Sequence, residues 1–423
     1  MEEATEHMET DGTEAPLSPA ESQTPKKEEH KLEGVAAIGY NFTTNQEALS
    51  DFVNTLSPIA KQQDETGIGR ITEGITSVLT ELGYSESQLK ARKDEKLGKP
   101  ENPPLISKED AGHRLLTIAR ALIPLTVPKQ MTLFRSAFVM LNSNFDQLIA
   151  DLISYFYKEF PDALHSDNSL TLSELQSCSD IDEAREFVTA KTVRTVTSGS
   201  LDQQMRFFRQ TIKVTGFDEV VKWDVVSEAV ARRNLLVHCG GIVNRSYLSE
   251  VPLEERPPDA KTAKIGSILV VPPQYFRDAF TEFFAAGMAV LQCCWRKWHK
   301  DERDEADGVL IDIMYRTLLK EDWKLAERIG ELAASCKAAD EENSLLLLFN
   351  YCISLKQLDR FDLLDKCIAN LDVSAHRPKF RLAVAALRND ERNIYRTGYA
   401  LDSGKSGVMM RCDRGLSEAS HGV

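Results

Sequence analysis

Long apolar runs are absent from this sequence of 423 residues. No segment reaches the roughly 18 consecutive apolar residues that a transmembrane helix requires. No apolar stretch follows a basic region near the N-terminus, as it would in a secretory signal. These absences argue against membrane spanning and secretion, so we expect a cytoplasmic protein with no membrane partner.

The cysteines show no pattern of a metal site or of a disulfide framework. None of the eight cysteines forms a C-x-x-C pair, and none has a histidine at the spacing of a zinc site. We therefore expect reduced, mostly buried thiols and neither a metal nor another cofactor. The cysteines lie at positions 178, 239, 293, 294, 336, 352, 367 and 412.

Positive charge is also scarce, with 51 Lys and Arg against 65 Asp and Glu, and the formal net charge is −14 at pH 7. Non-specific binding to nucleic acids depends on neutralising phosphates with Lys and Arg. The balance argues against a general nucleic-acid coat protein. It leaves room for a local basic cleft, because charge is judged for each domain.

Helical periodicity dominates the rest of the chain, and the fold class is predicted to be all-α. Residues 1–34 are rich in Glu, Thr, Pro, Ser and Lys, and they predict a disordered acidic arm. Residues 35–125 predict an N-terminal helical region, and residues 126–305 predict a helical bundle. Residues 306–396 predict shorter amphipathic helices, and residues 397–423 a disordered tail.

Two long helices are expected to frame the bundle, one from about Lys129 to Phe160 and one from about Gln274 to Lys300. Both carry phenylalanine at helical spacing, which is typical of a packed face. Between them Ile265–Val271 is a β-prone run that two prolines end. It predicts a short β-hairpin at the edge of the bundle.

The helices predicted beyond residue 306 resemble a tetratricopeptide-type array, although the full pattern of that repeat is missing. Segments 318–323 and 354–361 are similar and lie about one helix pair apart. Stacked helix pairs commonly form a concave surface that binds peptides. A protein partner is therefore expected at the C-terminal helices.

The most informative stretch is Phe217–Asn244, which reads FDEVVKWDVVSEAVARRNLLVHCGGIVN. It predicts a helix that ends at Gly240 and Gly241, because glycine adopts the left-handed conformation that ends helices. At about 100° per residue, an apolar stripe lies on one side and a charged row on another. The row would place Arg232 on the solvent-exposed face beside Glu228. The stripe consists of Trp223, Val226, Val230 and Val237.

Three polar residues, Arg233, Asn234 and His238, fall within the arc of that apolar stripe. A buried arginine is costly unless it is paired, so Arg233 implies a partner carboxylate, a bound phosphate or a subunit interface. Asn234 and His238 lie one turn apart, so the amide can orient the imidazole. These three residues are the candidate catalytic residues.

The segment Arg233–His238, RNLLVH, resembles the R-N-x-x-x-H motif of HEPN domains, which are all-α nucleotide- and RNA-binding modules. The continuation CGGIVN at 239–244, with Tyr247 and Leu248 after it, is similar to the branch related to ribonuclease toxins. The resemblance covers about residues 130–300. It implies a metal-independent endoribonuclease that acts as a homodimer, with Arg233 and His238 of each subunit meeting across the two-fold axis. It also implies a role in growth arrest, toxin–antitoxin systems or phage defence.

The chemistry of these residue types suits RNA cleavage without a metal. The 2′-hydroxyl attacks the adjacent phosphate, which requires proton transfer and stabilisation of charge on the phosphoryl oxygens. His238 would move the proton, and Arg233 would hold the phosphate bidentately. One histidine per chain is short of a separate acid and base, so an isologous dimer would supply the second.

Other interpretations of the same residues remain open. His238 can be a favourable partner of the helix dipole or a satisfied core group. Arg232 also has an allowed spacing to His238, and it can be the phosphate-binding residue in place of Arg233. At the level of function, the alternative is a non-catalytic HEPN dimerisation or RNA-binding module joined to a helical-repeat adaptor.

Basic residues around the motif are candidates for RNA contact. Arg206, Arg209 and Lys213 follow Lys191 and Arg194 over a short span, with Phe207 and Phe208 interleaved, and Arg245 follows the motif. Basic residues among aromatics can follow a nucleic-acid backbone and stack bases. The alternative is a solvated face above a core.

Overall fold

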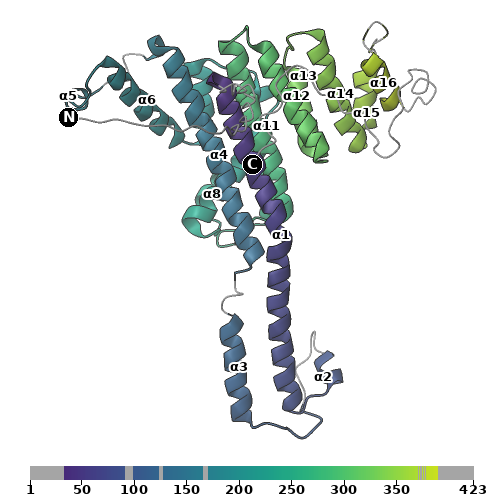
Figure 1. Ribbon diagram of the computed structural model, residues 1–423. Helices are drawn as coiled ribbons and strands as arrows, with labels where there is room; N and C mark the ends of the chain where they lie inside the picture. The colour runs from purple at the N-terminus through teal and green to yellow at the C-terminus, as the bar shows by residue number, and fades with distance from the viewer. Residues whose placement is uncertain are drawn as a thin grey trace, which may run out of the picture. The chain divides into compact units, whose positions relative to one another are not determined.

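The computed structural model of the protein describes residues 33–90, 99–122, 127–164, 170–369, 371, 374, 376 and 378–388. Only Glu33 and Gly34 of the predicted N-terminal arm fall in this part, and Gly34 begins a helix. The predicted tail lies outside it. The regular elements in the described ranges are all helical, which confirms the all-α prediction (Figure 1).

The longer helices account for most of the described chain. They are α1 (Gly34–Glu81), α3 (Lys108–Leu122), α4 (Lys129–Glu159), α6 (Ile181–Thr197), α8 (Trp223–Cys239), α11 (Pro273–Trp298), α12 (Arg303–Leu319), α13 (Trp323–Ser335) and α14 (Glu341–Gln357). The shorter helices are α2 (Glu86–Lys90), α5 (Leu172–Gln176), α7 (Leu201–Phe207), α9 (Arg245–Glu250), α10 (Pro258–Lys261), α15 (Phe361–Ile368) and α16 (Pro378–Leu387).

The core of the bundle forms where α1, α4 and α11 pack together (Figure 1). Aromatic pairs join them, with Phe42 and Phe284 at 5.9 Å and Phe145 and Phe283 at 5.5 Å between ring centroids. Gly287 makes this approach possible, because a Cβ there would lie 2.3 Å from the ring of Phe42. The predicted phenylalanine-rich faces of both long helices are buried in this core.

Helix α1 is longer than the sequence indicated. It runs through Pro58, and its N-terminal half buries Val35, Phe42 and Val53 in the bundle core. The bundle therefore includes residues that we had expected in a separate N-terminal region. The C-terminal half pairs with α3, where both terminal nitrogens of Arg114 bind the carboxylate of Glu81 at 2.6 and 3.0 Å.

The predicted β-hairpin is wrong. In the described part of the chain, residues 265–271 contribute one antiparallel bridge, between Ile268 and Ile242, and form no strand. The run is short, and Gly266 and the Pro272–Pro273 pair limit pairing on both sides. The bridge nevertheless brings this segment beside the end of α8.

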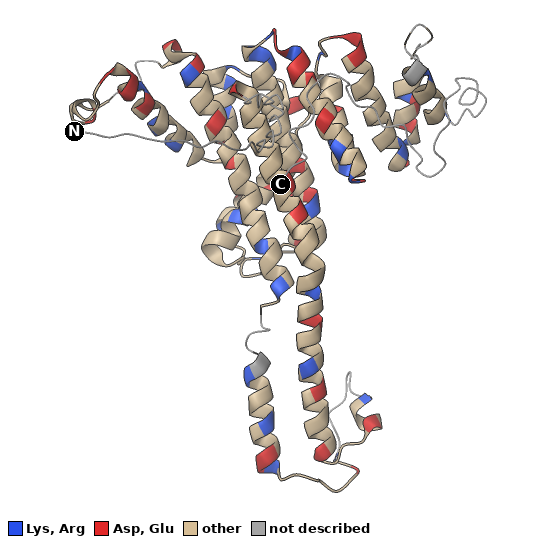
Figure 2. Ribbon diagram, viewed as in Figure 1, with Lys and Arg blue, Asp and Glu red and all other residues tan. Residues whose placement is uncertain are grey.

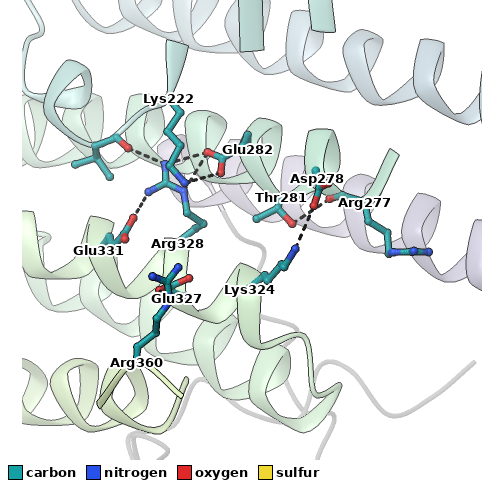
Figure 3. Close-up of polar contacts among 11 residues, drawn as sticks. Lys222, Arg277, Asp278, Thr281, Glu282, Lys324, Glu327, Arg328, Glu331 and Arg360 are labelled. Atoms are coloured by element: carbon teal, nitrogen blue, oxygen red, sulfur yellow. Dashed lines mark hydrogen bonds and ion pairs between the residues drawn. The ribbon is translucent and has the colours of Figure 1, made fainter. Parts of the chain in front are cut away.

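The C-terminal helices continue the same hydrophobic core and are tied to the bundle by ion pairs around the buried Arg328 and Glu282 (Figure 3). Arg328 of α13 donates from Nε to Glu282 of α11 at 3.0 Å and from Nη2 to the carbonyl of Val220 at 2.7 Å. Lys222 also binds Glu282, at 3.2 Å. Because Val220 and Lys222 directly precede α8, this network connects the C-terminal helices to the start of the motif helix.

Candidate active site

The motif helix α8 ends where the sequence predicts. Gly240 has a φ of 62° and Gly241 a φ of 86°, and the Gly241 amide donates to the Leu235 carbonyl at 2.9 Å. A Cβ at Gly241 would lie 2.6 Å from the carbonyl oxygen of Leu269, so this position requires glycine. Arg135 of α4 donates to the Leu236 carbonyl, and its positive charge complements the negative end of the helix dipole.

The buried face of α8 differs from the predicted stripe. Val237 is 49% exposed, whereas Arg232, predicted on the solvent-exposed face, is completely buried. The helix packs on two sides, with Val226, Ala229 and Leu236 in the main core. Its other side joins a second cluster that includes Ala231 and Leu235. A prediction based on one buried arc could not reveal the second side, because residues 243–269 form it.

Arg232 has a structural role. Its Nε donates to Glu228 at 2.9 Å, its Nη1 donates to Asp259 at 2.8 Å and to the Val270 carbonyl at 3.0 Å, and its guanidinium lies 3.9 Å over the ring of Tyr275. Glu228 also accepts from the hydroxyls of Tyr247 at 2.7 Å and Tyr275 at 2.5 Å. The pairing with Glu228 was predicted, but it lies inside the fold, and the alternative in which Arg232 binds a phosphate is wrong.

Arg233 lies at the edge of the fold. Its side chain is 26% exposed, and its Nη2 lies 2.8 Å from the carboxylate of Asp146 on α4. Its Nη1 donates to the Oδ1 of Asn234 at 3.1 Å. Its Nε is buried and has no hydrogen-bond partner among the described residues. Of the three partners that the sequence allowed, the structure contains the carboxylate.

Asp146 is the residue near the site that the sequence did not reveal. Burial raises its pKa, although the charge of Arg233 and a hydrogen bond from Gln204 of α7 act in the opposite direction. It precedes Arg233 by 87 residues. No local pattern in the sequence connects this position on α4 with Arg233.

His238 is exposed on the last turn of α8. Within the described ranges the imidazole makes no hydrogen bond or ion pair, and Asn234 directs its carbonyl oxygen to Arg233 instead. A single chain therefore brings Arg233, Asn234 and Asp146 into contact and leaves the histidine open to solvent. That exposed position permits contact with a substrate or a second subunit.

The basic residues suggested for RNA contact fall into two groups. Arg206 pairs with Asp202 at 2.5 Å, Arg209 with Asp218 at 2.6 Å, and Lys191 with Glu174 at 3.1 Å. Figure 2 shows basic and acidic residues interspersed along the helices. Arg206, Arg209 and Lys191 form the ion-paired group. The other group consists of the exposed residues Arg194, Lys213 and Arg245.

The interleaved aromatics do not form a platform for bases. Phe208 is completely buried in the core, and Phe207 packs against it. Base stacking requires an open ring face. The solvated-face interpretation therefore fits Phe208 better than base stacking does.

Metal-ligand groups, cysteines and helix hydropathy add three further observations on the described residues. No group of three or more His, Cys, Asp or Glu side chains is placed to hold a metal ion. The cysteines there are free thiols, of which Cys294 and Cys352 are buried and the other five partly buried. No helix combines the length and the apolarity needed to cross a membrane.

No protein-family model matches the chain, and no curated protein or solved structure is significantly similar to it. The resemblance to HEPN domains therefore depends on the residues of α8 and their surroundings alone.

Proposed function

We propose that this protein is a metal-independent endoribonuclease of the HEPN type, in which Arg233 and His238 act on the RNA backbone. The observation that carries the proposal is the contrast between two neighbouring arginines. Arg232 makes all its contacts inside the fold, whereas Arg233 lies at the surface with an incompletely bonded guanidinium, five residues before the exposed His238 on the same helix.

In this proposal Arg233 binds a non-bridging oxygen of the scissile phosphate. His238 takes the proton of the 2′-hydroxyl or returns a proton to the leaving 5′-oxygen. The products are a 2′,3′-cyclic phosphate and a 5′-hydroxyl. Asn234 holds the Arg233 guanidinium through its amide oxygen, which replaces the predicted role of orienting the imidazole.

A homodimer completes the site, because cleavage requires an acid and a base and each chain offers one exposed histidine there. The exposed aliphatic side chains at this end of α8 support an interface. Val237 is 49%, Ile242 48% and Ile268 68% exposed, and the β-bridge places the last two side by side. Exposed apolar side chains that lie together are typical of protein–protein contacts.

The proposal is tested by incubating RNA with the full-length protein in EDTA. We expect the wild type to cleave, and His238→Ala and Arg233→Ala to lose cleavage while retaining the fold. The control is His113→Ala, which removes an exposed histidine from α3. Equal activity in wild type and His238→Ala contradicts the proposal.

The alternative function is a catalytically silent helical module whose C-terminal helices bind a protein partner. The ion pairs of Arg206, Arg209 and Lys191 favour it, because they reduce the positive charge that RNA could meet. RNA binding without cleavage by the wild type, or no binding at all, favours this module.

A further inference from the structure

The mechanism leaves one part of the site without a role, the carboxylate of Asp146 that pairs with Arg233. This pair belongs to a polar cluster that also contains Asn142, one turn earlier on α4, and Gln204 of α7, whose side chain hydrogen-bonds to Asp146. The cluster is incompletely bonded. Asn142 Oδ1, Gln204 Oε1 and Arg233 Nε are all buried without a hydrogen-bond partner in the part of the chain that the structure describes.

The guanidinium of Arg233 offers two forks of donors. The side-on fork, formed by Nε and Nη2, is the one that grips two oxygens of a phosphate or carboxylate at once. In the structure Asp146 engages this fork at Nη2 alone, at 2.8 Å, while Nε stays unpaired. Asp146 therefore pairs with only one of the two donors of this fork, which can bind two oxygens together.

We propose that Asp146 is a positioning residue that competes with the substrate: it holds Arg233 through Nη2 until a backbone phosphate displaces it and takes Nη2 and Nε together. This inference rests on the proposed function. An unpaired buried donor is costly, so a ligand that pairs Nε gives the bound state a hydrogen bond that Asp146 does not provide.

The ion pair is weak enough to be displaced. Arg233 is 26% exposed and Asp146 36% exposed, so water screens their attraction. Burial also raises the pKa of Asp146, which means that its surroundings disfavour the carboxylate. A single phosphate must displace Asp146 from Arg233 with no other contact to offset the cost. An RNA strand can also bind other Lys and Arg side chains, and these contacts offset it. The competition therefore favours a polymer over free phosphate or a mononucleotide.

The test measures binding separately from cleavage. The probe is a short fluorescent 2′-O-methyl RNA, which lacks the attacking hydroxyl, and fluorescence anisotropy with the full-length protein at low ionic strength gives the Kd. Asp146→Asn removes the charge and keeps the shape. We expect it to tighten binding by about two- to five-fold, the equivalent of a partly exposed ion pair.

Three variants control this result. Asp151→Asn makes the same charge change five residues later on α4, where the carboxylate bonds to Gln147 and not to an arginine. It should leave the Kd near that of the wild type. Asp146→Glu retains the charge and should also bind like the wild type. In an Arg233→Gln background Asp146→Asn should have no effect. If Asp146→Asn does not fold, as judged by circular dichroism, Asp146→Ser supplies the neutral side chain.

The outcomes separate this inference from the proposed function. If Arg233→Gln weakens binding and Asp146→Asn does not tighten it, the competition is refuted and the endoribonuclease proposal stands. The competition is also refuted if Asp151→Asn tightens binding equally, because the effect is then one of net charge. If no variant binds the RNA, both proposals fail.

Discussion

Replacing each of the two adjacent arginines of α8 by glutamine should affect a different property, because Arg232→Gln should mainly lower stability and Arg233→Gln should mainly abolish RNA cleavage. Arg232→Gln removes the charge that neutralises Glu228, whose side chain is 3% exposed, and it breaks the hydrogen bonds to Asp259 and Val270. Removing one partner of a buried ion pair costs about 3–5 kcal/mol, because the other charge stays buried without compensation. Relative to a total of about 5–15 kcal/mol, this loss is severe.

Arg233→Gln should cost far less stability. Its ion pair with Asp146 is partly exposed, and pairs of this kind contribute about 0–1 kcal/mol. Glutamine can still donate to Asp146 from its amide. The same variant should lose RNA cleavage, since the group that would contact the phosphate is gone.

Equilibrium unfolding in urea, followed by circular dichroism at neutral pH, measures both variants under one set of conditions. A double-mutant cycle with Glu228→Gln isolates the Arg232–Glu228 interaction. In the Glu228→Gln background, Arg232→Gln should cost less than it does in the wild type. A cost below about 1 kcal/mol for Arg232→Gln, or equal costs for the two arginines, refutes the assignment of Arg232 to the fold and Arg233 to the site.

Three further predictions follow from the surroundings of α8. Gly241→Ala should destabilise the protein by about 1–3 kcal/mol, because of its positive φ and the Leu269 carbonyl 2.6 Å from the new Cβ. Gly240→Ala, with open space around the Cβ, should cost about 1 kcal/mol, and thermal melts compare the two. Ile242→Asp and Ile268→Asp should convert the dimer to monomers in sedimentation velocity and abolish cleavage. The control is Leu116→Asp, because Leu116 is an exposed aliphatic residue on α3, and this variant should remain dimeric and active. A dimer that persists in Ile242→Asp and Ile268→Asp argues against this interface. Burial raises the pKa of Asp146, so the folded protein binds its proton more readily than the unfolded chain. Its contribution to stability is therefore complete below the ordinary aspartate pKa and is lost as pH rises through the raised pKa. Other carboxyl groups titrate in the same range, so the test is the stability of the wild type minus that of Asp146→Asn, which should fall as pH rises when both are unfolded in urea across the acidic range.

The sequence predicted those parts of the fold that depend on local pattern. The phenylalanine spacing of α4 and α11 identified two buried faces, and the Gly240–Gly241 pair located the end of α8, because both signals act within a few turns of helix. Helix α1 escaped this reasoning. Pro58 and a polar middle obscure its continuity, and only contact with α4 and α11 reveals that its first half belongs to the bundle.

The candidate site was predictable only in part. The sequence singled out Arg233, Asn234 and His238 as polar residues out of place on a helix. It misplaced Arg232, because the segment that buries this residue contributes Asp259 and Val270 from later in the chain. Asp146 was missed for the same reason, since no local pattern links α4 to Arg233 across 87 residues.

The most direct measurement of the central claim is the identity of the ends that the purified protein leaves on RNA in the presence of a chelator. Mass spectrometry of the products should find 2′,3′-cyclic phosphate and 5′-hydroxyl ends with the wild type, and intact RNA with His238→Ala. Intact RNA with the wild type, or the same products at the same rate with His238→Ala, contradicts the account.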